Sequence, residues 1–230
     1  MPFIDMLTTS GLGSLLGMRH ALEPDHLAAV STLITDERSS YKAAWLGACW
    51  GLGHTLALVV VGAVLVVLRA EMPVRVANLF ELFVALMLIA LGIRAIYQAM
   101  HQGEHGPLHA HKHGDVVHAH RAAAPHVHIG ARALARRPLI VGAIHGLAGS
   151  GALTALVLAT LPTTAAQLTY MGLFGLGSTL GMAVLSGVLG WPLARIGANP
   201  RVARAVSLAV GLISTLLGIA WGYPLLNQIW

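Results

Sequence analysis

The sequence predicts an all-α integral membrane protein with six transmembrane helices, arranged as two inverted repeats of three helices each. Three observations lead to this fold class: an apolar composition, six long apolar stretches and an internal repeat. Hydrophobic residues make up 56% of the 230 residues and charged residues only 10%. Soluble domains carry about 25% charged residues. The mean hydropathy of +0.73 points the same way.

Each of the six stretches is long enough to cross a bilayer, which takes roughly 20 residues. They cover residues 4–34, 43–68, 76–99, 139–161, 166–190 and 203–226. The first is too long for one straight helix across a hydrocarbon core of about 30 Å. It contains Pro24, which has no N–H to donate to the carbonyl of His20. We therefore expect the first helix to be broken at Pro24, leaving that carbonyl free as a further oxygen ligand.

The two halves of the chain share three short motifs in the same order. His20-Ala-Leu matches His145-Gly-Leu, Trp50-Gly-Leu-Gly-His54-Thr matches Phe174-Gly-Leu-Gly-Ser178-Thr, and Leu91-Gly-Ile matches Leu217-Gly-Ile. Because each repeat has three spans, the halves have opposite topology, as in secondary transporters with a site near the midplane. The predicted organisation is a first repeat at 1–100, a loop at 101–138 and a second repeat at 139–230.

Basic residues are concentrated on one side of the predicted spans. Ten of the 14 lie in or beside the loops at 35–42, 100–138 and 191–202, and two, Arg69 and Arg75, lie in the opposite loops. The positive-inside rule then predicts an inner (plasma) membrane protein with both termini outside and the central loop in the cytoplasm. The net charge of +5 is therefore a topological signal, and nucleic acid is not an expected partner.

One polar segment interrupts the first apolar stretch. It runs from Arg19 to His26 and contains two imidazoles and two carboxylates, a costly combination inside a bilayer that marks a functional site. Two imidazoles and a carboxylate suit a borderline divalent cation such as Ni²⁺ or Co²⁺ better than Ca²⁺ or Mg²⁺. Proton relay by the histidines is the alternative. The predicted metal ligands are His20, Asp25, His26 and His54, with His145 and Glu23 as further candidates.

Two of these residues have a second interpretation. His145 is also explained as a helix-packing histidine. Glu23 lies four residues after Arg19, so the two side chains would form an ion pair across one helical turn and help the segment to insert.

The loop at 101–138 holds nine of the 13 histidines. Such a tract is typical of metal binding, since neutral imidazole binds nickel, cobalt, zinc and copper. Because Gly, Ala and Pro interleave, we expect a flexible auxiliary chelator, and a disordered linker is the alternative. The nine residues are His101, His105, His109, His111, His113, His118, His120, His126 and His128.

The segment Leu16-Gly-Met-Arg-His20-Ala-Leu-Glu-Pro-Asp25-His26 resembles the His-x4-Asp-His signature of the nickel/cobalt transporter family, and Gly-Leu-Gly-His54-Thr resembles the element in that family's next helix. The resemblance implies a permease for Ni²⁺ or Co²⁺ with His20, Asp25, His26 and His54 in the metal-recognition positions. Family members usually have eight spans, so this chain is similar to a shorter branch of urease-accessory membrane proteins. It lacks the family's later acidic motifs, since no Asp or Glu follows Asp115.

The predicted function is uptake of Ni²⁺ or Co²⁺ into the cytoplasm by a secondary permease, with the ion as substrate and no cofactor. Two alternatives stay open: an exporter coupled to proton influx, and a non-transporting membrane metal-binding accessory protein for urease or hydrogenase assembly. The sequence contains neither a His-Glu-x-x-His pair nor a carboxylate set aside as a base. We therefore do not expect an enzyme. The expected partners are the metal ion and the lipid bilayer, with a second copy of the chain or a cytoplasmic metallochaperone as further candidates.

Overall fold

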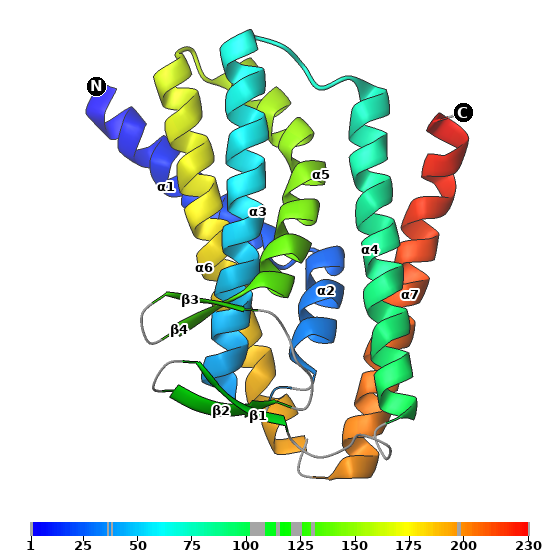
Figure 1. Ribbon diagram of the computed structural model, residues 1–230. Coiled ribbons are helices and arrows are strands. Elements are labelled where there is room, and N and C mark those ends of the chain that lie inside the picture. The colour runs from blue at the N-terminus through cyan, green and yellow to red at the C-terminus, as the bar shows by residue number, and fades with distance from the viewer. Residues whose placement is uncertain are drawn as a thin grey trace.

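A computed structural model describes most of the chain as long helices standing side by side (Figure 1). It covers residues 2–35, 37, 39–101, 109–113, 116–120, 126–129, 132–196 and 199–229. Within this part lie seven helices: α1 (Pro2–His20), α2 (Pro24–Ile34), α3 (Ser40–Leu68), α4 (Val74–Met100), α5 (Arg136–Thr160), α6 (Thr164–Ile196) and α7 (Pro200–Ile229).

The break predicted in the first helix is present as the junction between α1 and α2. Pro24 occupies the first helical position of α2, where its missing N–H costs nothing, and Glu23 before it is extended. The His20 carbonyl is not free, however. It accepts a hydrogen bond from the Glu23 N–H at 3.1 Å, so the expectation that the break leaves this carbonyl without a partner is wrong.

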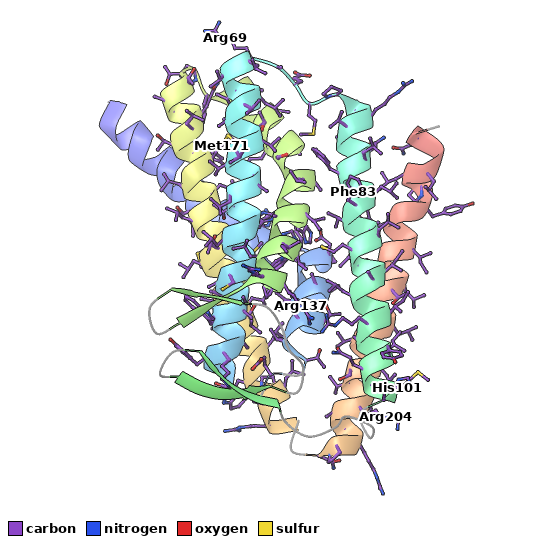
Figure 2. The ribbon with its side chains drawn as sticks, in the orientation of Figure 1. Arg69, Phe83, His101, Arg137, Met171 and Arg204 are labelled. Carbon is purple, nitrogen blue, oxygen red and sulfur yellow. The ribbon has the colours of Figure 1, made fainter. Side chains whose placement is uncertain are left out.

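Five helices among the described residues are long and apolar enough to cross a membrane. They match the last five predicted spans, with mean hydropathies of 1.6 to 2.4 over their best windows. Large apolar side chains such as Val188 and Phe83 are exposed on their outer faces, as a lipid-facing surface requires (Figure 2). The protein is therefore a multi-pass membrane protein. α2, with 11 residues, is too short to span alone.

Both chain ends lie at the same end of the helices, opposite the strands (Figure 1). We call these the terminal end and the hairpin end. Arg69 lies at the terminal end, whereas His101 and Arg204 lie at the hairpin end (Figure 2). The loops that were predicted to share the basic side therefore lie at the hairpin end, opposite Arg69.

The central loop contains two antiparallel hairpins, which were not expected. β1 (His109–His113) pairs with β2 (Val116–His120), and β3 (His126–Ile129) pairs with β4 (Arg132–Ala135). The protein is thus all-helical except for these strands. His105 lies outside the described residues, and His101 follows the end of α4. The register pairs His109 with His120 and His111 with His118.

The long helices pack closely against one another. α3 packs against α6, α4 against α7, α1 against α6 and α3 against α5. A methyl group added at Gly17 of α1 would overlap the Phe174 carbonyl of α6, and one added at Gly142 of α5 would overlap the Trp50 carbonyl of α3. These close approaches bring the polar junction after α1 and the middle of α5 against α3 and α6.

Candidate metal site

Four histidines and one aspartate from the two halves of the chain meet in the interior. His20 ends α1, Asp25 and His26 begin α2, His54 lies in α3 and His145 lies in α5. Their exposed fractions are 9% for Asp25, 2% for His145, 1% for His26 and 0% for His54. The junction between α1 and α2 lets residues five and six positions apart reach the same point, as the sequence predicted.

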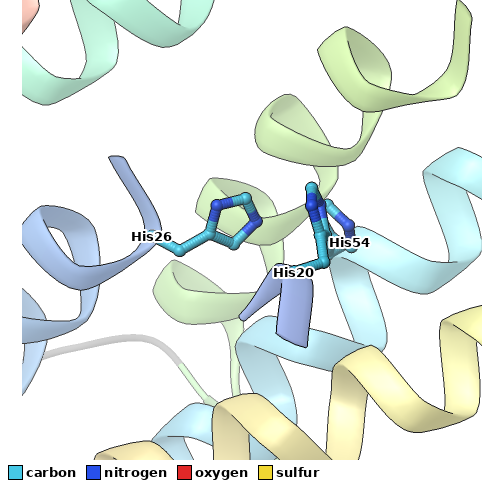
Figure 3. A group of neighbouring side chains, drawn as sticks. All are labelled: His20, His26 and His54. Atoms are coloured by element: carbon cyan, nitrogen blue, oxygen red, sulfur yellow. The ribbon is translucent and has the colours of Figure 1, made fainter. Parts of the chain in front are cut away.

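Three of the imidazoles face one another (Figure 3). The ring centroids of His20 and His26 are 4.4 Å apart, and each lies 5.3 Å from the ring of His54. One nitrogen from each ring lies within 4.8 Å of the others, close enough to share a metal ion. Nε2 of His20, Nε2 of His26 and both nitrogens of His54 are buried without a hydrogen-bond partner among the described residues.

Asp25 connects His26 to His145. Its Oδ1 lies 3.0 Å from Nδ1 of His26, and its Oδ2 lies 2.7 Å from Nε2 of His145. An ionised carboxylate only accepts hydrogen bonds, so in each neutral ring the proton is on the nitrogen facing Asp25. The other nitrogen of each ring then has a free lone pair. Asp25, His26 and His145 form a second group able to hold a metal ion, and this group shares His26 with the first.

Glu23 pairs with His20 and not with Arg19. Its Oε1 lies 2.9 Å from Nδ1 of His20, three residues earlier, and no contact between Glu23 and Arg19 is found among the described residues. The predicted Arg19–Glu23 ion pair is therefore wrong, because the α1 helix ends before it can place the two side chains on adjacent turns. The contact leaves Nε2 of His20 as the nitrogen facing His26 and His54.

A cavity of about 770 Å³ reaches this cluster from between the helices. His20, Asp25, His26 and His145 line its inner part, and Arg19 and Glu23 line it beside them. The wall continues along α5 to Leu156 and along α7 to Trp221. Leu156 lies four residues before the end of α5 at the terminal end. The cavity thus extends from the cluster toward the terminal end.

Packed apolar side chains fill the space on the other side of the cluster. The buried residues of α2, among them Val30 and Ile34, join Trp50, Leu88 and Met182 in one core. Because α2 runs from the cluster toward the hairpin end (Figure 1), this core closes the route between the site and that end.

Sequence reasoning did not single out three residues that border the cluster or its cavity. Trp50 packs against His26 and His145 with ring centroids at 5.4 and 5.8 Å, and Phe174 lies 5.3 Å from His20. Trp50 and Phe174 occupy matching positions of the repeat, which was the available signal. Glu81 of α4 lines the cavity, and its charge within an apolar span was the signal there.

The fold and the cluster define a multi-pass membrane protein with a buried nitrogen-rich site able to hold a transition-metal ion. A family model described as a high-affinity nickel-transport protein matches residues 6–229. The chain belongs to this nickel-transport family, so its role is nickel transport or one related to nickel. Family membership points to a non-catalytic protein.

The chain is also similar to individual proteins. The chain is 32% identical over 225 residues to a urease accessory protein, UreH, of Bacillus sp. (strain TB-90), covering 98% of this chain and 95% of that protein. It is 24% and 27% identical to two chloroplast proteins of Arabidopsis thaliana, FOR GROWTH AND FERTILITY 2 and 1, over 94% and 93% of this chain but only 56% and 58% of theirs. No solved structure matches the chain.

Proposed function

We propose that this protein carries Ni²⁺ or Co²⁺ across the plasma membrane into the cytoplasm as a secondary permease. The observation that carries the proposal is the cluster of buried nitrogens of His20, His26 and His54, unpartnered among the described residues, in a nickel-transport family member. His20 and His26 also line the cavity that reaches the cluster. Unpartnered buried polar atoms are costly. A bound cation that accepts their lone pairs removes that cost and selects for nitrogen-preferring metals.

In this proposal the carboxylates hold the rings, and one of them also binds the ion. Glu23 fixes His20 and Asp25 fixes His26, which is how carboxylates next to metal-binding histidines set the nitrogen that faces the metal. The ion occupies the three-histidine group and then the group of Asp25, His26 and His145, because the two share His26. An ion in the second group takes the place of the hydrogen bond between Asp25 and His145. Because these two residues belong to different halves of the chain, the position of the ion is coupled to the contact between the halves.

Six spans in two inverted repeats are the architecture that we propose for this transport. The α1–α2 pair forms the first span. Exchange of the two halves predicts that α1 meets α6 just as α5 meets α3, and both packings occur. The matching residues Gly17 and Gly142 approach the matching residues Phe174 and Trp50. Thr55 and Thr179, also matching, share a hydrogen bond at 2.8 Å.

The proposed orientation and the membrane potential support uptake. The positive-inside rule predicts that the terminal end lies outside, and the cavity extends toward that end. In the proposed orientation an ion would therefore reach the site from outside. The membrane potential contributes about 2.3 kcal/mol per charge per 100 mV, hence about twice that for a divalent ion entering a negative interior. The histidines of the loop, which this orientation places in the cytoplasm, would then receive the ion.

An accessory role in metalloenzyme assembly is the second candidate, and the urease accessory relative favours it. Export driven by proton influx is the third. Nickel accumulation in cells overexpressing the protein separates all three. Uptake predicts more radioactive nickel in these cells than in cells without the protein, export predicts less label together with gained nickel resistance, and an accessory protein changes neither.

A further inference from the structure

Among the described residues, Glu81 is the one cavity-lining carboxylate that the proposed site does not use. It lies in α4, seven residues after Val74, which is about 10 Å along the helix from the terminal end. His145 lies 15 residues before the end of α5 at the same end, about 22 Å away along that helix. Glu81 therefore faces the same cavity as the cluster but closer to the terminal end.

The other two acidic residues of the cavity wall already have partners. Asp25 contacts His26 and His145, and Glu23 contacts His20. For Glu81 no ion pair or hydrogen bond is found among the described residues. Its neighbours Phe80, Leu82 and Phe83 are apolar. A charged residue inside a spanning helix that faces a cavity marks a substrate or ion pathway.

We propose that Glu81 is an outer station for the divalent cation, which holds the hydrated ion on its way to the histidine cluster. This inference rests on the proposed uptake function. An oxygen ligand suits the role because it binds a hydrated ion more weakly than nitrogen ligands do. A negative charge in a narrow, low-dielectric cavity also concentrates cations in front of the inner site. Arg19 lines the same cavity, and its positive charge repels a cation. The negative charge of Glu81 offsets this repulsion.

The test is radioactive nickel uptake by vesicles containing purified wild-type protein, Glu81→Gln or Glu81→Asp. The Gln variant should raise the nickel concentration for half-maximal uptake on the order of three- to tenfold with an unchanged maximal rate, and Asp should restore most of the difference. Glu71→Gln is the matched control, since it removes the same charge just before α4 and outside the cavity wall. An unchanged half-saturation in the Gln variant, or a fall in the maximal rate alone, overturns the proposal.

A second measurement separates this inference from the proposed function. Stopped-flow mixing of Ni²⁺ with the detergent-solubilised chain reports binding without transport. Glu81→Gln should lower the association rate and leave the dissociation rate unchanged. If wild-type protein binds nickel but moves none, the transport proposal fails and the association rate still decides the role of Glu81. Equal association rates for wild type and variant would contradict it.

Discussion

The two carboxylates of the polar segment differ in what they contact, although they are only two residues apart. Asp25 is buried and bridges His26 and His145, whereas Glu23 is exposed and contacts only His20. The residue types alone predicted a shared site but not this division. It depends on where α1 ends, and the identity of each hydrogen-bond partner is set by tertiary packing.

Asp25→Asn should weaken nickel binding by about 10- to 100-fold, the usual cost of removing a carboxylate that orients a metal-binding histidine. The neutral amide keeps the shape but loses the charge that holds both ring protons in place. Isothermal titration of purified protein with Ni²⁺ checks this, with Glu71→Gln as the control for loss of one negative charge. Binding by the Asn variant within about twofold of wild type would exclude this role.

At the scale of elements, the sequence predicted the helix break and five of the spans because both depend on local signals, a proline and long apolar runs. It did not predict the hairpins. The alternation of His109, His111 and His113 has the period of two that favours a strand, whereas the interleaved Gly, Ala and Pro favoured a flexible segment.

The paired glycines test the reciprocal packing of the elements. Gly17→Ala and Gly142→Ala should both lower thermal stability, each by about 1–3 kcal/mol, because the added methyl group meets a backbone carbonyl of the neighbouring helix. Thermal unfolding in detergent measures this. Gly172→Ala is the control, since nothing lies within 4 Å of a methyl group there. If one of these two variants were as stable as Gly172→Ala and the other were not, the two helix contacts would not be equivalent. That result would contradict the reciprocal packing.

At the scale of the whole molecule, the proposal of uptake rests on the distribution of basic residues and on the cavity. The ends of the helices differ in basic charge, which the sequence alone predicted, and the cavity extends from the cluster to the end with fewer basic residues. The cavity could not be predicted from the sequence, because it depends on how α2 packs between the site and the hairpin end. Glu81 was visible as a charge in an apolar span, yet its role needed the cavity wall to be known.

The most direct test of the central claim is nickel flux into vesicles that contain only the purified protein and carry an inside-negative potential. Wild-type protein should accumulate radioactive nickel, with cobalt competing, and His26→Ala should abolish the flux because His26 belongs to both metal groups. Gly172→Ala, which adds a methyl group outside the cluster where nothing lies within 4 Å, should leave it unchanged. Flux by His26→Ala at the wild-type rate, or no flux by the wild type, would contradict the account.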